Sequence, residues 1–316
     1  MEINPRHTPI IIIGPTAIGK SQIAIDVAIE NNCEIISMDS VMIYSYFNIG
    51  SSKPTSAQRK LVPHHLIDIL EPHQPYSVGQ FLIDVNKKIK EVQSRGKTPL
   101  IVGGTYMYAN ALMTPTVSVE TITDHGVRDY YNNKLMSNGL EALWHELVKQ
   151  DARYLNKISP NDTQRILRAL EVLKSTGKSL LDHWKEAATA PMATIKVVKI
   201  IPTDREALKN TIQRRFNLML EEGLVDEVKS LLSMNGSNSF KALKSIGYRQ
   251  VVSFIHKNCS YDDMIEKAVI STRQYAKRQL TWLRNNHYHQ EFNIKTASSE
   301  EIMLKINKVL DNTFES

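Results

Sequence analysis

The 316-residue sequence is poor in cysteine and has no long apolar run. Cys33 and Cys259 are the only cysteines, which excludes a disulfide framework and a cysteine-based zinc site. No uninterrupted apolar stretch approaches the roughly 20 residues that span a bilayer, and Met1–Pro9 has no apolar core of signal-peptide length. We therefore expect a protein of the reducing cytoplasm with no membrane role.

The sequence also lacks internal repeats and low-complexity tracts. No coiled-coil pattern indicates a partner chain, so we expect a monomer. Hydrophobic residues make up 42% and charged residues 23%, which is ordinary for a globular protein. The length allows one large domain or two modest ones. There are 39 Lys and Arg residues against 33 Asp and Glu residues. The resulting net charge of +6 weakly favours a polyanionic binding partner.

Near the N-terminus the sequence contains the phosphate-loop pattern G-x-x-x-x-G-K-[ST]. This glycine loop consists of Gly14, Pro15, Thr16, Ala17, Ile18, Gly19, Lys20 and Ser21. The β-branched run Ile10–Ile13 before it predicts a buried strand, and Gln22–Ala28 after it predicts a helix. The glycines let N–H groups converge on anionic oxygens, Lys20 adds a positive charge, and Ser21 offers a hydroxyl suited to Mg²⁺. The loop predicts a substrate with a diphosphate or triphosphate.

Further short apolar runs predict strands that end in polar residues or glycines. Glu34–Met38 is followed by Asp39 and Ser40, Pro99–Val102 is followed by Gly103–Thr105, and Leu66–Ile69 is another strand candidate. Helical spacing lies between these runs, which is typical of a doubly wound parallel sheet. Ligands bind at the carboxyl edge of such sheets, so Asp39 and Thr105 should lie beside the glycine loop.

The pattern changes beyond this first part of the chain. Four helices without intervening strands are predicted: Tyr130–Met136, Leu140–Gln150, Ala152–Lys157 and Thr163–Ser175. A strand returns at Ile195–Ile201, and the last third is helical. The expected fold is α/β, a P-loop parallel sheet flanked by helices, with an all-helical insertion domain and a helical C-terminal region. Residues 1–114 and 193–316 would form the core domain, and residues 115–192 the insertion.

Two helices carry basic residues opposite their apolar stripes. Arg165 and Arg168 lie on one predicted helix, while Arg273, Lys277 and Arg284 share one side of Ile270–Arg284. Such faces either bind nucleic acid through phosphates or are simply solvated.

The local chemistry leaves two reactions open. In phosphoryl transfer, Asp39 or Asp68 would serve as the acidic magnesium ligand of a kinase acting on a nucleoside or small metabolite. In the other reaction the diphosphate of an allylic substrate is expelled, and Asp39 takes a proton from the incoming nucleophile. A non-enzymatic alternative is an RNA-binding protein that uses the glycine loop as a nucleotide switch.

Several segments together resemble one family, the bacterial tRNA dimethylallyltransferases, also called tRNA isopentenyltransferases. The resemblance runs in collinear order from about residue 9 to residue 285. It is carried by Ile12–Ser21, Ser37–Ser40, Ile49–Gly50, Lys53–Pro54, Pro63–Asp68, Val102–Thr105, Asn161–Glu171, Gly223–Val225, Ile246–Tyr248 and Tyr275–Trp282.

The resemblance implies transfer of a dimethylallyl group from dimethylallyl diphosphate to N6 of the adenosine just 3′ of the tRNA anticodon. Asp39 would be the general base, Thr105 would help to hold the adenine or the diphosphate, and Arg215 would join the glycine loop on the diphosphate. Mg²⁺ would be the cofactor, with Ser21 as its ligand; whether ATP binds stays open. The residues expected to contact tRNA are Asp39, Ser40, Val41, Met42, Thr105, Arg128, Gln164, Arg165, Ile166, Leu167, Arg168, Arg273 and Lys277.

Overall fold

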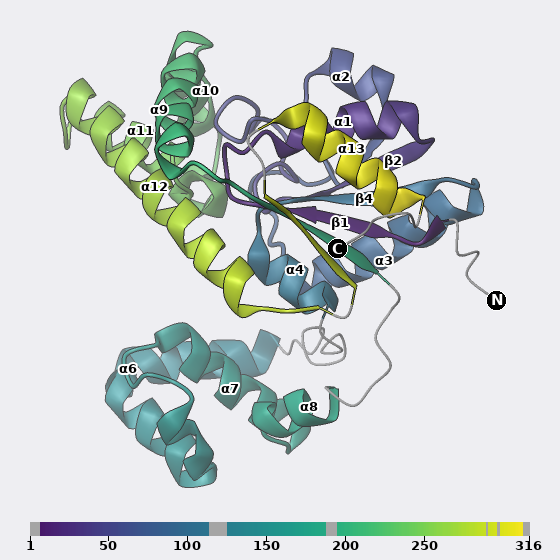
Figure 1. Ribbon diagram of the computed structural model, residues 1–316. Coiled ribbons are helices and arrows are strands. Elements are labelled where there is room, and N and C mark those ends of the chain that lie inside the picture. Colours follow the sequence, from purple (N-terminus) through teal and green to yellow (C-terminus); the bar gives the residue numbers. More distant parts are fainter. Residues whose placement is uncertain (1–6, 114–124, 188–194, 289, 296–297, 312–316) are drawn as a thin grey trace. The chain divides into compact units, whose positions relative to one another are not determined.

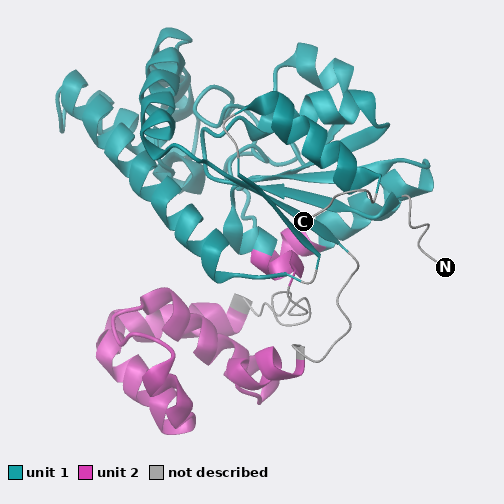
Figure 2. Ribbon diagram, viewed as in Figure 1, with its two compact units in different colours: residues 1–76, 83–109, 194–316 teal, residues 77–82, 110–193 magenta. Residues whose placement is uncertain are grey.

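The computed structural model describes residues 7–113, 125–187, 195–288, 290–295 and 298–311. The chain divides into two compact units (Figure 2). One comprises residues 1–76, 83–109 and 194–316, and the other residues 77–82 and 110–193. The two predicted domain boundaries, after residue 114 and after residue 192, lie outside the described residues.

The first unit is built on a parallel six-stranded sheet, which confirms the predicted fold class. The spatial order is β3-β2-β4-β1-β5-β6, so the central strand β1 lies between β4 and β5. All four isoleucines of β1 are buried, as expected for a strand covered on both faces. The strands are β1 (Ile10–Ile13), β2 (Cys33–Met38), β3 (His64–His65), β4 (Thr98–Gly103), β5 (Lys196–Ile201) and β6 (Glu291–Lys295).

Helices cover both faces of this sheet (Figure 1). On one face α1 (Lys20–Glu30) and α13 (Ser299–Leu310) share a core with Ile10 and Ile12, while α3 (Val78–Ser94) and α4 (Tyr106–Met113) lie on the other face. A further helix, α2 (Ser56–Leu61), precedes β3.

A second hydrophobic core lies beyond the carboxyl edge of the sheet. It is formed by the loop around Phe47 and by four helices. These helices are α9 (Arg205–Glu221), α10 (Leu224–Ser233), α11 (Tyr248–Ile255) and α12 (Tyr261–Asn285). Among the described residues, no helix is both long and apolar enough to cross a membrane.

The second unit contains helices and no strand among its described residues. Its elements are α6 (His125–Gln150), the 3₁₀ helix η2 (Ala152–Asn156), α7 (Thr163–Thr176) and α8 (Leu180–Ala187). Gly139 interrupts α6 with φ 77° and ψ 170°, which explains why the sequence predicts two helices there. Asp162 caps α7, and Gly177 ends it in a left-handed conformation.

Two predictions about strands were wrong. A strand was expected at Leu66–Ile69, but the observed strand β3 comprises only the two residues before it, His64–His65. Leu66 and Asp68 have φ values of 61° and 54°, which no strand accommodates. This backbone lets the Asp68 carboxylate bind both Lys53 and Arg59. At the other end of the sheet, β6 follows a region expected to be helical throughout, and it pairs with β5 from Val197 onward.

Candidate functional site

A cavity of about 1180 Å³ opens at the carboxyl ends of β1, β2 and β4, where the sequence places its polar motifs. Its walls also include α9, the turn before α11 and the middle of α12. Among the residues that line it are Thr16, Ala17, Gly19, Lys20, Ser21, Asp39, Ser40, Val41, Met42, Ser52, Gly104, Thr105, Arg215, Tyr248, Tyr275 and Gln279. Gly14, Pro15 and Ile18 of the glycine loop do not line it.

The glycine loop joins β1 to α1 in a backbone shape that requires its glycines. Gly19 has φ 88° and lies directly before the first residue of α1. A Cβ atom on Gly14 would lie 2.9 Å from the carbonyl oxygen of Ile200. The N-terminus of α1, with its free N–H groups and the positive end of its dipole, therefore faces the cavity.

Lys20 is a half-buried cation in the wall of this site. Its ammonium donates to the carbonyl oxygen of Pro15 at 2.7 Å. Burial and the nearby positive charge of Arg215 lower the pKa of Lys20 to about 7, and the charge of Asp39 offsets part of this shift. An anion bound beside Lys20 would favour its charged form.

Arg215, on α9, is a second half-buried cation. Its Nη1 donates to Thr16 Oγ1 at 3.3 Å, and its Nε donates to Ser52 Oγ at 3.1 Å. Burial lowers the pKa of Arg215 and the negative charge of Asp39 raises it, yet a guanidinium stays protonated at neutral pH. The side chain thus links the glycine loop to the loop after β2 and adds positive charge to the cavity.

Glu227, on α10, holds the loop that carries Ser52. Its Oε2 accepts from the backbone N–H groups of Asn48 and Ile49 at 3.0 and 2.7 Å. Its Oε1 accepts from the N–H of Gly50 at 3.2 Å and from the Tyr248 hydroxyl at 2.7 Å. One carboxylate therefore fixes three successive N–H groups, and with them the wall of the cavity next to Arg215.

Asp39 lies at the tip of β2, half-buried in the cavity wall. Its Oδ1 accepts from the N–H groups of Val41 and Met42 at 2.8 and 3.2 Å, which orients the carboxylate. No hydrogen bond to Oδ2 is present among the described residues. Asp39 therefore combines a fixed orientation with one oxygen that is left for a proton donor.

Thr105 follows β4 and lies near the tip of β2. A Cβ atom on Gly103 would lie 2.1 Å from the carbonyl oxygen of Met38, so only glycine lets these two strand ends meet. The backbone carbonyl oxygen of Thr105 accepts from the N–H groups of Tyr108 and Ala109 at the start of α4, and Thr105 is half-buried in the same cavity as Asp39.

Five of the residues predicted to contact tRNA, residues 164–168, lie on α7 in the helical unit. Gln164 and Arg165 are exposed, whereas Ile166 is fully buried in the core of this unit, so only its backbone is left for the predicted RNA contact. Leu167 is half-buried beside the same core. The Arg165 guanidinium binds Asp162, the N-cap residue of α7.

Two further predicted arginines of this unit converge on one buried carboxylate. Arg128 and Arg168 reach Oε2 of Glu171 at 3.1 and 3.2 Å, and Glu171 is 3% exposed. In the other unit, Arg273 and Lys277 lie on α12 but are not among the residues that line the cavity.

Several cavity residues have no role that sequence patterns predict. Ser52 accepts a hydrogen bond from Arg215, and Tyr248 donates one to Glu227. Gln279 and Tyr275 are visible in the sequence only as members of the segment Tyr275–Trp282. All four come from parts of the chain far from the strand ends.

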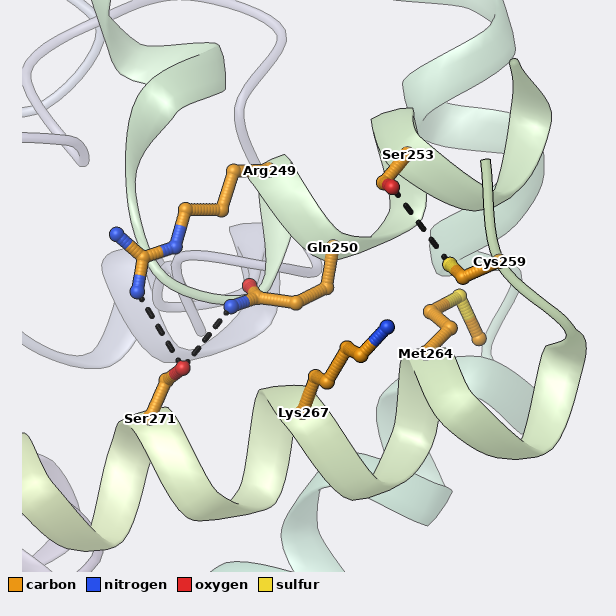
Figure 3. Close-up of a pocket in the computed structure, with 7 residues that line it drawn as sticks. All are labelled: Arg249, Gln250, Ser253, Cys259, Met264, Lys267 and Ser271. Atoms are coloured by element: carbon orange, nitrogen blue, oxygen red, sulfur yellow. Dashed lines mark hydrogen bonds between the residues drawn. The ribbon is translucent and has the colours of Figure 1, made fainter. Parts of the chain in front are cut away.

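A smaller pocket of about 350 Å³ lies between α11 and α12 (Figure 3). Arg249 and Gln250 both donate to Ser271 Oγ, at 3.3 and 3.1 Å. Gln250 also accepts from the N–H of Gly247, in the turn that lines the larger cavity. These bonds fasten that turn to α12, which is a structural role.

Comparison with known proteins relates the whole chain to one group. The family model for IPP transferase matches residues 42–286, and the model for isopentenyl transferase matches residues 8–65. A tRNA dimethylallyltransferase from Francisella philomiragia is 39% identical over 291 residues, which cover 92% of this chain and 94% of the relative.

Solved structures agree with these matches. The full-length tRNA isopentenylpyrophosphate transferase from Bacillus halodurans is 32% identical, with a TM-score of 0.70, and the match covers 97% of this chain and 96% of that one. A eukaryotic dimethylallyltransferase acting on tRNA is 27% identical, with a TM-score of 0.82, over 96% of this chain and 79% of that chain.

Proposed function

Because this chain belongs to the IPP transferase family, we propose that it transfers a dimethylallyl group from dimethylallyl diphosphate to tRNA and releases diphosphate. The acceptor is N6 of the adenosine 3′ to the anticodon. The observation that carries the proposal is one cavity in which Lys20 and the N-terminus of α1 lie beside Asp39. A kinase is not favoured, since the matched families and relatives are prenyl or isopentenyl transferases.

The cationic side of the cavity would hold the leaving group. The glycine loop, residues 14–21, supplies backbone N–H groups, while Lys20 and Arg215 supply two positive charges. As the bond between C1 and the bridging oxygen breaks, negative charge grows on the departing diphosphate. Fixed donors in a partly buried cavity stabilise that charge more in the transition state than in the ground state.

Asp39 would act as the base on the acceptor. The lone pair on N6 forms the new bond to C1, the electrons of the broken C1–O bond leave with the diphosphate, and N6 gives a proton to Asp39. An amine conjugated to a purine is a weak nucleophile, so Thr105 would help to hold the adenine in line with C1. A stacked base is out of reach, so the adenosine would flip into the cavity.

Magnesium is the proposed cofactor. Among the described residues, no group of three or more His, Cys, Asp and Glu side chains could hold a metal ion, so the protein offers few ligands of its own. Ser21, in the first turn of α1 and in the cavity wall, fits as one hydroxyl ligand. Diphosphate and water would supply the remaining ligands, and the ion would add positive charge next to the diphosphate.

We also propose that the protein works as a monomer in the cytoplasm. Both cysteines are free thiols, which fits a reducing compartment.

Label transfer tests the proposed function. The protein is incubated with Mg²⁺, unmodified tRNA and dimethylallyl diphosphate labelled in the allyl group, and a parallel reaction contains labelled ATP. We expect the allyl label in tRNA and none from ATP. Turnover of ATP without label in tRNA would instead support the kinase.

Donor binding is expected to weaken as pH rises above 7. Free Lys20 has a pKa of about 7, and a bound diphosphate raises that pKa, so binding takes up a proton at higher pH. The dissociation constant of dimethylallyl diphosphate should rise by up to about tenfold per pH unit, because one proton is linked to binding. Lys20→Arg keeps its charge and should flatten the profile; equal profiles for both proteins would contradict this role of Lys20.

The double variant Arg165→Ala with Arg168→Ala is expected to weaken tRNA binding and to lower its salt dependence. Each lost phosphate contact reduces the slope of log K against log salt by roughly 0.7 to 0.9. The tRNA dissociation constant is measured at salt concentrations from about 50 to about 200 mM. Lys305→Ala on α13 is the control, and a slope shared by all three proteins would show that these arginines do not contact phosphates.

A further inference from the structure

Gln279 lies in the C-terminal half of α12, and its amide joins the two loops that enclose the carboxyl edge of the sheet. The side chain is 2% exposed, and both ends of its amide are bonded. Oε1 accepts from the backbone N–H of Thr16 at 2.9 Å, and Nε2 donates to the carbonyl oxygen of Gly104 at 2.6 Å. One neutral group thus spans segments that are far apart in the sequence.

The space around Gly104 is shaped to admit this amide. A Cβ atom on Gly104 would lie 2.6 Å from Gln279 Nε2 and 3.7 Å from Lys20 Nζ. The Tyr275 hydroxyl, one helical turn before Gln279, donates to the same carbonyl oxygen at 3.3 Å. The amide, the Gly104 backbone and the Lys20 ammonium therefore converge at one point of the cavity.

The two bonded backbone groups belong to the two sides of the proposed reaction. Thr16 lies in the glycine loop that would hold the diphosphate, and Gly104 directly precedes Thr105 beside Asp39. The inference therefore rests on the proposed function. We propose that Gln279 is a positioning residue, which sets the distance between the bound diphosphate and the groups that hold and deprotonate N6.

The bonding pattern calls for a side chain that both accepts and donates without carrying charge. Glutamine meets this need at every pH, whereas an ionised glutamate accepts from Thr16 but cannot donate to Gly104. Methionine has a similar length and makes neither bond. Since a displacement of about 1 Å can cost on the order of 100-fold in rate, losing this link should slow the transfer step.

The test compares Gln279→Glu and Gln279→Met with the unchanged protein. Single-turnover transfer to tRNA and the dissociation constant of dimethylallyl diphosphate are measured separately. We expect transfer to slow by about 10- to 100-fold at neutral pH, with donor affinity changed by less than about threefold, because the glycine loop keeps its other donors. Gln274→Glu, at an exposed position of the same helix, is the control and should behave as the unchanged protein.

A pH series gives a readout that a merely structural role would not produce. Protonation of Glu at position 279 restores a donor to Gly104, so the rate of Gln279→Glu relative to the unchanged protein should recover as pH falls. Lys20, Arg215, Asp39 and Tyr275 face the same cavity in both proteins, so the ratio removes their shared contribution. Gln279→Met should show no recovery. If the transfer rate of Gln279→Glu recovers at low pH and falls again when the pH of the same sample is raised, misfolding is excluded as the cause of the slow transfer.

The outcomes separate this inference from the proposed function. If the unchanged protein transfers label but both variants match it at every pH, the role of Gln279 is overturned. A constant ratio for Gln279→Glu across the pH series, or a loss confined to donor affinity, would also overturn it. If the unchanged protein transfers no label, the proposed function itself fails.

Discussion

Replacing Asp39 with Asn is expected to slow dimethylallyl transfer to tRNA by about 100- to 10,000-fold, the range for loss of a general base. The substitution keeps the shape of the side chain, and the Asn oxygen can still accept from the N–H groups of Val41 and Met42. It removes the basic oxygen that would take the N6 proton. Single-turnover transfer with saturating donor and tRNA measures this step, and tRNA affinity should be unchanged.

Asp262→Asn, at an exposed site in the first turn of α12, provides the matched control. It removes the same charge without touching the cavity, so transfer should proceed at the normal rate. A fully active Asp39→Asn protein would mean that another group, or water, accepts the proton.

The second large effect is expected for Lys20→Met, which keeps the length of the side chain but removes its charge. Transfer should fall by about 100- to 1000-fold, because the charge that develops on the departing diphosphate loses a positively charged partner in the cavity. Donor affinity should fall as well, although Arg215 still supplies one charge. The dissociation constant and the single-turnover rate, measured on the same samples, separate the two effects.

Lys209→Met, at an exposed position of α9, is the control for loss of a positive charge. A Lys20→Met protein whose binding is weak but whose transfer rate at saturation is normal would show that Lys20 binds the ground state only.

Much of the sheet could be predicted from the sequence because its strands are short, apolar and buried on both faces. The runs at Ile10–Ile13 and Glu34–Met38 are of this kind. The hydrophobic pattern did not predict the strand β3, His64–His65, because two residues carry little periodicity and because Leu66 and Asp68 after them have left-handed backbone conformations. β6 was missed because it is an edge strand with alternating polar residues, a weak signal beside long helices.

The positions of Asp39 and Thr105 at the sheet edge could be predicted from the ends of their strands. Arg215, Ser52 and Gln279 could not be placed in the same way. Gln279 and Thr16, for example, are 263 residues apart, and only the packing of α12 brings them together. Local spacing contains no information about such a contact, which depends on how the helices beyond the sheet close over it.

The most direct test of the account follows the oxygen that bridges the allyl group and the diphosphate. The protein is given tRNA and dimethylallyl diphosphate with ¹⁸O at this bridging position, and the released phosphorus product is analysed by mass spectrometry. If the diphosphate leaves by cleavage of the C1–O bond, all of the ¹⁸O will be in free diphosphate, and the allyl group will be on N6 of the adenosine 3′ to the anticodon. If the ¹⁸O stays with the allyl group while phosphate is transferred elsewhere, the glycine loop serves phosphoryl transfer and the account is contradicted.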